Sequence, residues 1–368
     1  MTSEHFRGSP DVTRQGTGLP ESVQKSKSDP VVGESLTYLL AVALAAVVSA
    51  LFIVAMRGDV LVAFRTILSS SLGSLGGIAQ TLNKVSPILL GSTAVMLARR
   101  GGFFNIGVDG QIYAGAIATT GLAFLAAGWG LPRGVLLPAV LLAGIIGGAA
   151  LGAVPGALRA RWGVSEIFVT VMLNFVAFYL TDYLTTGPWN DPISGEAITR
   201  PIAAAATLPM MLPEAGGHTG ILLAVGAAVL VALLLRRTVL GYEIRAAGDN
   251  PRAARIAGIA LPRITLLALT LSGGLAGLAG AIEVSGYHNR LILGLTPGYG
   301  AMAILIAVLG KMRPLGVAVA SVLVAILMVG SDSLQRSVGL PASAGFVFQA
   351  IVVLCVLLVD ARRARGGP

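Results

Sequence analysis

The sequence contains 368 residues, of which 55% are hydrophobic and only 12% are charged. The charged share is about half that of a typical soluble domain, and the mean hydropathy of +0.83 leaves too few polar residues to cover a soluble protein of this size. Aromatic residues amount to 6%, which is low for an outer-membrane β-barrel with its aromatic girdles. The single cysteine, Cys355, excludes an internal disulfide framework and a cysteine-based zinc site. Composition therefore predicts an all-α, polytopic transmembrane helix bundle.

The chain opens with a polar segment, residues 1–35, that has no apolar run. We expect this segment to be a disordered cytoplasmic tail. The first apolar run begins only at Leu36, too late for a secretory signal, and therefore indicates a retained membrane anchor. Residues 36–360 would form the transmembrane domain, with a long cytoplasmic segment at 236–263, and residues 361–368 a basic cytoplasmic tail.

Ten apolar segments are candidates for membrane spans, because a helix needs about 20 apolar residues to cross the hydrocarbon. The segment at 299–309 is too short to cross alone and would be tilted or re-entrant. The ten segments are 36–56, 81–97, 106–127, 135–158, 167–184, 220–235, 264–284, 299–309, 315–330 and 344–359.

Basic residues test this arrangement, since an even number of spans puts both termini on one side. If that side is the cytoplasm, it receives all but seven of the 26 Lys and Arg residues. This positive-inside bias predicts that both termini are cytoplasmic, and it accounts for the net charge of +9 without a nucleic-acid partner. The seven exceptions are Arg57, Arg65, Lys84, Arg133, Arg200, Arg290 and Arg336.

Two ladders of small residues each follow one face of a predicted helix. Small side chains let helix backbones approach closely in a bilayer, so we interpret both ladders as packing surfaces of a tight bundle. The ladders consist of Gly144, Gly148, Gly152 and Gly156, and of Gly273, Gly277 and Gly280.

The stretch 99–111 is too polar for its membrane context, because Asn105, Asp109 and Gln111 lie at the start of a predicted span. A carboxylate buried there costs several kcal/mol unless it is paired or hydrated. The glycines of the stretch permit unwound backbone, which is tolerated only where it lines a cavity or packs inside protein. We assign these three residues to a substrate pathway. A polar helix start at the interface, capped by Asn105, is the alternative.

Four further polar residues are candidates for the same pathway. Glu166 suits the N-terminus of the next span, and Thr170 and Asn174 are four residues apart, so they share a helix face. That face points either toward a pathway or toward another helix. Glu283, near the outer end of its span, either pairs with Arg290 or belongs to a solvated rim.

The segment 236–263 carries the clearest cytoplasmic charge and is long for a plain connecting loop. Its pattern predicts a short helix, a break at Asn250–Pro251 and a second short helix that Gly258 can end. Small side chains let a helix sink into a partner's groove, and the flanking arginines can pair with acidic residues at its rim. We assign to this docking surface Gly241, Glu243, Arg245, Gly248, Asn250, Pro251, Arg252, Ala253, Ala254 and Gly258.

Several chemistries have no support in the sequence. It contains no phosphate loop of the form Gly-x-x-x-x-Gly-Lys-Ser/Thr, no His-Glu-x-x-His motif and no Gly-x-Ser-x-Gly turn. Its three histidines, His5, His218 and His288, are far apart in the sequence. We therefore expect no enzymatic activity, no metal site and no cofactor on this chain.

The polar stretches together resemble the permease subunits of nucleoside and simple-sugar ABC importers. Gly-Phe-Phe-Asn-Ile-Gly-Val-Asp-Gly-Gln at 102–111 resembles one signature of that family, although the family usually has Glu at the place of Asp109. Gly-Tyr-Glu-Ile-Arg-Ala-Ala-Gly-Asp-Asn-Pro-Arg-Ala-Ala at 241–254 resembles the cytoplasmic loop by which such permeases contact their ATPase. Shorter matches are Ser-Glu-Ile at 165–167, Met-Leu-Asn at 172–174, Gly-Leu-Ala-Gly-Ala at 277–281 and Gly-Tyr-Gly at 298–300. The resemblance runs from about 36 to 359, and branched-chain amino acid permeases are more distant members of the same superfamily.

This resemblance implies an import permease in a bacterial cytoplasmic membrane that works by alternating access. It would pair with a second, homologous permease subunit, with cytoplasmic ATPase subunits that use the ATP, and with an extracytoplasmic substrate-binding lipoprotein. The polar loop at 185–219 would lie outside, where the binding protein docks.

Two other classes of function remain as alternatives. In an ion- or proton-coupled secondary carrier, Asp109, Glu166 and Glu283 would bind ions or relay protons, but the sequence has no convincing internal repeat of the kind such carriers show. A structural subunit that anchors other proteins would not need polar residues at membrane depth. Within the ABC importers, a branched-chain amino acid permease is the alternative to a nucleoside or sugar permease.

Overall fold

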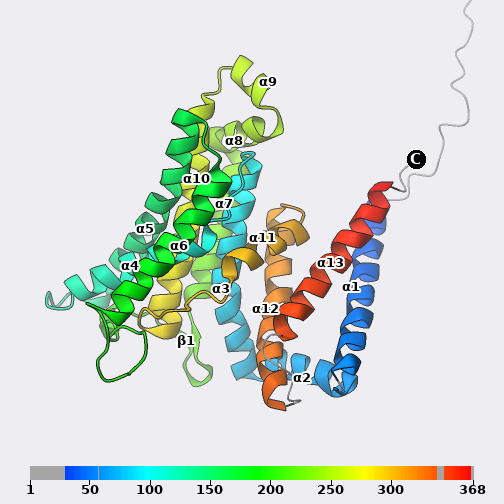
Figure 1. The fold of residues 1–368 in the computed structure, drawn as a ribbon, viewed down its shortest axis with the longest axis horizontal. Helices are drawn as coiled ribbons and strands as arrows, with labels where there is room; N and C mark the ends of the chain where they lie inside the picture. Colours follow the sequence, from blue (N-terminus) through cyan, green and yellow to red (C-terminus); the bar gives the residue numbers. More distant parts are fainter. Residues whose placement is uncertain (1–29, 57, 338–343, 366–368) are drawn as a thin grey trace, which may run out of the picture.

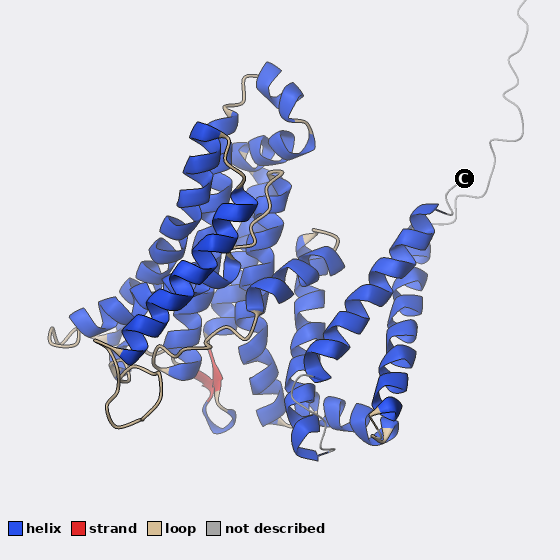
Figure 2. Cartoon of the chain, viewed as in Figure 1, coloured by secondary structure: helices blue, strands red, loops and turns tan. Residues whose placement is uncertain are grey.

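α-Helices account for nearly all regular structure in residues 30–56, 58–337 and 344–365, the residues that the computed structural model describes (Figure 2). The all-α prediction is thus confirmed. The expected N-terminal tail lies outside these ranges except for residues 30–35, which are helical because α1 begins at Pro30, a residue that suits a first helical turn. Residues 361–365 of the expected C-terminal tail likewise continue the last helix.

Each of the ten predicted apolar segments falls on a helix. In chain order these helices are α1 (Pro30–Ala55), α3 (Leu75–Arg100), α4 (Val108–Leu125), α5 (Arg133–Trp162), α6 (Glu166–Thr186), α7 (Gly220–Arg237), α10 (Leu261–Ile282), α11 (Tyr299–Leu309), α12 (Pro314–Ser337) and α13 (Ala344–Arg365). By length and apolar composition, five spans among the described residues can cross a membrane, and a bent pair formed by α1 and the helix after it makes a possible sixth. The count of ten crossings therefore stays a prediction.

A short helix that the sequence reading missed, α2 (Val60–Leu72), follows α1 at an angle of 117°. Asp59 starts it, because its carboxylate accepts a hydrogen bond from the backbone N–H of Val62 at 3.0 Å. The helix runs across one end of the bundle and links α1 to α3 (Figure 1). Its 13 residues include an arginine and three serines, so it gives no signal of a membrane span.

The two glycine ladders lie in the most extensive helix–helix contact of the bundle, between α5 and α10. A Cβ atom on Gly277 would lie 2.9 Å from the Cα atom of Gly148 and closer still to the carbonyl oxygen of Gly144. A Cβ atom on Gly273 would lie 3.0 Å from the Cα atom of Gly152. The packing role that we predicted for the ladders is confirmed, since any larger side chain would push the two backbones apart. Gly280 makes the same kind of contact with α4.

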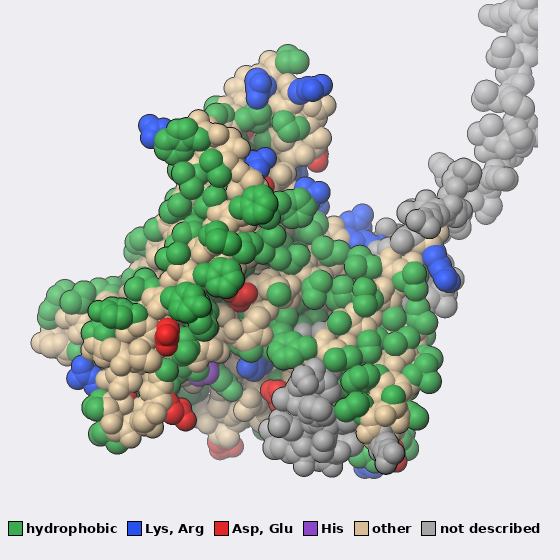
Figure 3. Space-filling view, viewed as in Figure 1, with side chains coloured by type: hydrophobic (Ala, Val, Ile, Leu, Met, Phe, Trp, Pro, Cys, Tyr) green, Lys and Arg blue, Asp and Glu red, His purple; other side chains and the backbone are tan. Residues whose placement is uncertain are grey.

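The bundle has two distinct ends. At one end lie two short helices, α8 (Val239–Asp249) and α9 (Pro251–Ile256), together with the C-terminal end of α13 (Figure 1). The opposite end carries α2 and the long loop after α6, which contains the ribbon of β1 (Met210–Leu212) and β2 (Gly217–His218) and the 3₁₀ turns η2 (Ala204–Ala206) and η3 (Pro213–Ala215). Hydrophobic side chains cover much of the visible flank, and Lys and Arg side chains gather around the end with α8 and α9 (Figure 3).

The seam between α5 and α10 predicts opposite outcomes for two glycine-to-alanine changes. Gly277→Ala should lower the thermal unfolding temperature of the purified protein, because overpacking costs about 1–3 kcal/mol and the neighbours of Gly277 are backbone atoms that cannot rotate away.

The matched control is Gly226→Ala on α7, where an added Cβ atom would meet nothing within 4 Å. This change should be neutral or should stabilise the helix by up to about 1 kcal/mol. Equal unfolding temperatures for the two variants would contradict the packing role of the seam.

Candidate functional site

The unwound segment between α3 and α4 is held in place by contacts with α6 and α8. Gly102 has a φ of +84° and packs against α8, where an added Cβ atom would lie 3.2 Å from the Cα atom of Gly248. The backbone N–H of Phe104 donates to the Glu166 carboxylate at 3.1 Å, and that carboxylate also pairs with Arg159. The polar groups at this depth are therefore bonded within the protein, as membrane burial requires.

Asn105 and Gln111 form a closed amide network in the core. Asn105 Nδ2 donates to Gln111 Oε1 and to Ser272 Oγ, each at 2.8 Å, and Gln111 Nε2 donates back to Asn105 Oδ1 at 3.1 Å. Ser272 in turn donates to the carbonyl of Ala94 at 2.7 Å. The network ties α3, α4 and α10 together. Asn105 is not the helix cap of the alternative reading, since Gly107 holds that position and its N–H donates to Asn105 Oδ1 at 3.0 Å.

The predicted shared face of α6 is present and faces another segment of the chain. Asn174 Oδ1 accepts from the N–H of Gly110 at 2.8 Å, and Asn174 Nδ2 donates to the carbonyl of Ile106 at 2.9 Å. Thr170, on the same face, packs on Gly107 so closely that an added Cβ atom there would lie 2.9 Å from its own Cβ. Together with Glu166, these side chains clamp α6 to the unwound segment.

Asp109 connects α4 to the start of α11. Its Oδ1 atom accepts a hydrogen bond from the backbone N–H of Gly300 at 2.8 Å. That N–H belongs to the first turn of α11, which otherwise has no side-chain cap, and its N-cap residue Gly298 has a φ of +78°. A carboxylate at a helix N-terminus satisfies orphan N–H groups and suits the helix dipole.

A cavity of about 390 Å³ opens beside this contact and brings Asp109 and Asn174 together. Its walls combine a carboxylate, an amide and a hydroxyl with four aromatic rings, and two of these rings, Tyr113 and Phe178, meet edge to face at 6.0 Å. Such walls suit a ligand that has a flat or ringed body and hydroxyl groups. The cavity is lined by Asp109, Tyr113, Asn174, Phe175, Phe178, Tyr179, Gly294, Thr296 and Gly298.

Glu283 is buried, with 2% exposure, in the π-helical turn η4 (Glu283–His288) that continues α10. Its carboxylate lies 3.4 Å from His288 Nε2, whereas Arg290 pairs with Asp191 at 3.7 Å. Both readings of Glu283 from the sequence, a pair with Arg290 and a solvated rim, are therefore wrong. A π-turn places residue i+5 beside residue i, and this spacing selects His288.

His218 and Lys84 are two polar residues beside η4 that the sequence analysis did not assign to a site. His218 Nδ1 accepts from the N–H of Gly220 at 3.0 Å, so the proton of the neutral ring lies on Nε2. Burial lowers the pKa of His218, and the charge of Glu283 opposes part of this effect. Lys84 Nζ bonds the Tyr299 hydroxyl at 3.2 Å and lies 5.4 Å from the centre of the Tyr287 ring. Neither residue could be connected to Glu283 from sequence spacing.

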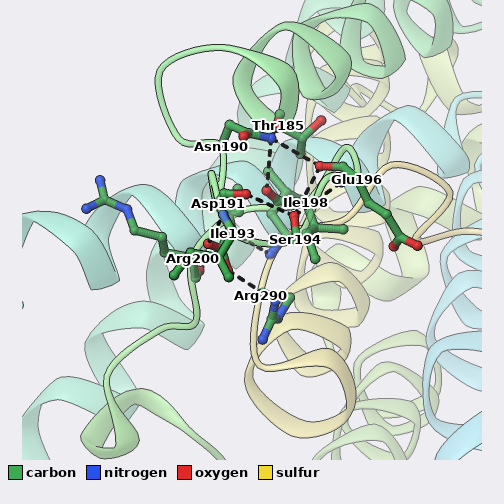
Figure 4. A network of polar contacts seen from close by, with 11 residues as sticks. Thr185, Asn190, Asp191, Ile193, Ser194, Glu196, Ile198, Arg200 and Arg290 are labelled. Atoms are coloured by element: carbon green, nitrogen blue, oxygen red, sulfur yellow. Dashed lines mark hydrogen bonds and ion pairs between the residues drawn. The ribbon is translucent and has the colours of Figure 1, made fainter.

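The long loop after α6 is hydrogen-bonded to the segment that follows η4. Asn190 Nδ2 donates to the carbonyls of Thr185 and Glu196, at 2.6 and 3.1 Å, and the pair of Arg290 with Asp191 joins the two segments (Figure 4). The backbone N–H of Thr199 donates to the carbonyl of Leu291 at 2.9 Å. These bonds give the loop a defined conformation at this end of the bundle.

At the other end, the segment 236–263 forms the predicted helix, break and second helix. Asn250 Oδ1 accepts from the N–H groups of Arg252 and Ala253, each at 3.1 Å, and so caps α9. Ala254 is buried against the body of the protein, whereas Ile256 is 89% exposed. Ile256 lies beside exposed Arg252 and Ala253 on α9, and the sequence analysis did not single it out.

Of the remaining assigned residues of this segment, some pack α8 against the body of the protein and others lie at its surface. Gly241 and Gly248 seat α8, because an added Cβ atom would collide with the backbone of Leu234 or of Arg100 respectively. Glu243 is half-buried on α8, and Gly258, with a φ of +84°, reverses the chain after α9. Arg245 lines a cavity with Arg100 at the ends of α3 and α7, away from the residues that α9 exposes.

Known proteins resemble this chain over most of its length. Residues 77–357 match the family described as branched-chain amino acid transport system / permease component. The glucose ABC transporter permease protein of Haloferax volcanii is 34% identical over 331 residues, which cover 87% of this chain and 86% of that protein. The nucleoside ABC transporter permease protein of Lactococcus lactis is 29% identical, with 87% and 90% covered. The guanosine ABC transporter permease protein of Bacillus subtilis is also 29% identical, with 87% and 92% covered.

The bond from Asp109 to α11 predicts a graded effect of substitution. Asp109→Ala should destabilise the purified protein by about 1–3 kcal/mol, because it leaves a buried N–H without an acceptor. Asp109→Asn should cost less, since the amide oxygen can still accept. Thermal unfolding measures both changes. Asp249→Ala is the control, because Asp249 is exposed and a surface change of this kind stays within about 0.5 kcal/mol. If Asp109→Ala were as stable as this control, Asp109 would not hold α11.

Proposed function

The chain belongs to the family of permease components of branched-chain amino acid transport systems, and on that premise we propose a substrate, an orientation and a coupling surface for it. It is a multi-pass membrane protein and the permease subunit of an ABC importer, a class that works with an ATPase and a substrate-binding protein. The ion-coupled carrier is set aside by this membership.

The proposed substrate is a nucleoside or a simple sugar. The observation that carries this choice is the cavity at Asp109, where aromatic rings stand beside carboxylate, amide and hydroxyl groups. Aromatic faces stack on a sugar ring or a nucleobase, and the polar groups can bond the hydroxyls. The three similar permeases are named for glucose, nucleosides and guanosine, which agree with this chemistry. A branched-chain amino acid, the substrate in the family description, is the second candidate.

In the proposed orientation, the end with α8 and α9 faces the cytoplasm of a bacterial cell. The C-terminal end of α13 lies at this end, and α1 starts there because α2 joins it at the opposite end (Figure 1). Lys and Arg gather at this end (Figure 3), in agreement with the positive-inside rule. The hydrogen-bonded loop after α6 then faces outward, where a substrate-binding lipoprotein would dock.

The proposed coupling surface consists of Arg252, Ala253 and Ile256 on α9. These residues are exposed, while Ala254 on the opposite face of the same short helix is buried against the body of the protein. A movement of the ATPase against α9 would therefore be transmitted to the body of the protein through Ala254. ATP is bound and hydrolysed by the partner ATPase, and a second, homologous permease completes the pathway by alternating access. This chain itself breaks no covalent bond.

Uptake by cells that contain the complete transporter tests the substrate class. Accumulation of a radiolabelled nucleoside or sugar should depend on this chain and on ATP, and it should persist when an ionophore collapses the ion gradients. Excess unlabelled nucleoside or glucose should compete, whereas leucine should not. Competition by leucine alone would overturn the proposal in favour of amino acid import.

Bulk added to the exposed face of α9 tests the coupling surface. Ala253→Trp should leave the protein in the membrane but should weaken co-purification with the ATPase, or leave ATP hydrolysis uncoupled from uptake. Arg252→Glu should act in the same direction, more strongly at low salt, where surface charges are least screened.

The control for added bulk is Ala127→Trp, an exposed alanine in the turn after α4 near the opposite end. This variant should assemble and transport normally. Normal assembly and normal ATP-driven uptake in Ala253→Trp and Arg252→Glu would show that α9 does not carry the coupling.

A further inference from the structure

Four arginines converge on one cavity at the end of the bundle that carries α8. The cavity, of about 340 Å³, lies where α3 and α7 end and α12 begins, and α8 closes one side of it. No carboxylate lines it. Its lining consists of Arg100, Leu235, Arg236, Arg245, Arg313 and Pro314.

Three of these arginines, Arg100, Arg236 and Arg245, bring their charge to the cavity from α3, α7 and α8. Arg100 spends its Nε and Nη2 donors on the carbonyl of Met312, at 3.1 and 2.8 Å, which is a neutral acceptor. Within the described part of the chain, no carboxylate forms an ion pair with Arg100, Arg236 or Arg245. The C-terminal ends of α3 and α7 carry partial negative charge that suits one arginine each, but side chains from four elements converge here. Like charges held this close repel one another, and a bound anion would offset that repulsion.

Guanidinium groups select a phosphate group among the available anions. Arginine presents paired N–H donors that match two phosphate oxygens, and several arginines can surround one phosphodiester. Basic pockets between membrane helices on the cytoplasmic side are suited to anionic lipid headgroups. The remaining choice is between a lipid and a free phosphate.

The apolar surface next to the cavity favours a lipid. On α7, Leu233 and Val229 lie three and seven residues before Arg236, so they continue its helix face toward the membrane centre, and they are 49% and 51% exposed. On α12, Leu315 follows Pro314 and is 77% exposed, and Val319 one turn later is 64% exposed. A phosphate bound among the arginines would thus have apolar tracks beside it that fit acyl chains.

We propose that this cavity binds the phosphate headgroup of an anionic phospholipid from the cytoplasmic leaflet. The location in that leaflet rests on the proposed orientation, whereas the binding chemistry does not. Arg245 belongs to α8, and Arg100 and Arg236 belong to α3 and α7. The lipid would therefore join the segment that contacts the ATPase to the ends of two membrane helices.

Native mass spectrometry of the purified full-length permease tests the site with phosphatidylglycerol as the probe and phosphatidylcholine as the neutral reference. The wild type should retain phosphatidylglycerol in preference. The double change Arg236→Gln with Arg245→Gln should weaken this binding about tenfold or more, because each surface cation contributes about a factor of five or more to anionic lipid binding. Arg236→Lys with Arg245→Lys keeps the charge but loses the paired donors, and should fall between the two.

The charge-matched control is Arg252→Gln with Arg263→Gln, which removes two exposed arginines at the same end but outside the cavity. It should bind phosphatidylglycerol within about twofold of the wild type. Thermal unfolding in neutral lipid checks that all variants are folded. If the double glutamine variant does not fold, the double lysine variant is compared with the wild type instead.

Three results would overturn the proposal. The cavity variant and the control could bind phosphatidylglycerol equally. Millimolar inorganic phosphate could displace the lipid and stabilise the protein as well as the lipid does, which would identify a site for the free anion. Alternatively, lipid binding could be unchanged while co-purification with the ATPase is lost, which would identify a protein contact. Co-purification is a separate measurement on the assembled transporter. The lipid-binding assay uses the permease alone and measures no transport, so its outcome is independent of the proposed substrate and coupling surface.

Discussion

The close backbone contact between α5 and α10 is the constraint on which the rest of this permease depends. Glycines on both helices let the two backbones approach until no Cβ atom would fit between them. A lipid bilayer supplies no hydrophobic drive that would bring helices together, so packing at this distance has to supply the stability. Because α10 also contacts α4 through Gly280, it becomes the central helix of the bundle.

The position of α10 connects the two ends of the molecule. Helices α8 and α9 lead through residues 257–260 into its first turn, and its last turn continues as the π-helical segment that contains Glu283. The amide network at Asn105 reaches α10 through Ser272, and Asp109 extends the same region to α11. A displacement at the end with α8 and α9 would therefore reach Glu283 near the opposite end through α10, and the Asn105 network through Ser272.

Much of the fold could be predicted from the sequence, because apolar runs and glycine ladders are local patterns. The ten segments fall on helices, and the capped break at Asn250–Pro251 occurs as expected. The helix α2 was missed because it is short and mixed in polarity.

The site was harder to predict, because its contacts join residues that are distant in the sequence. Asp109 bonds Gly300, which is 191 residues away, and Arg100 bonds the carbonyl of Met312, 212 residues away. No spacing rule identifies such partners. The partner of Glu283 is local, but its identification as His288 instead of Arg290 depends on a π-turn that the sequence does not signal. The role of the polar residues in the pathway stays a prediction, whereas their bonds to the unwound segment are visible directly.

The close backbone contact implies that α5 and α10 move as one unit when the transporter works. Spin labels at Leu142 on α5 and Leu266 on α10, both partly exposed positions, would report this directly in a Cys355→Ser background. Pulsed electron paramagnetic resonance would measure their separation in the assembled transporter, without nucleotide and with bound ATP. If the two helices move together, their separation should differ between the two states by no more than about 1–2 Å, the size of ordinary helix adjustments. A shift approaching a full helical turn, about 5.4 Å, would contradict it.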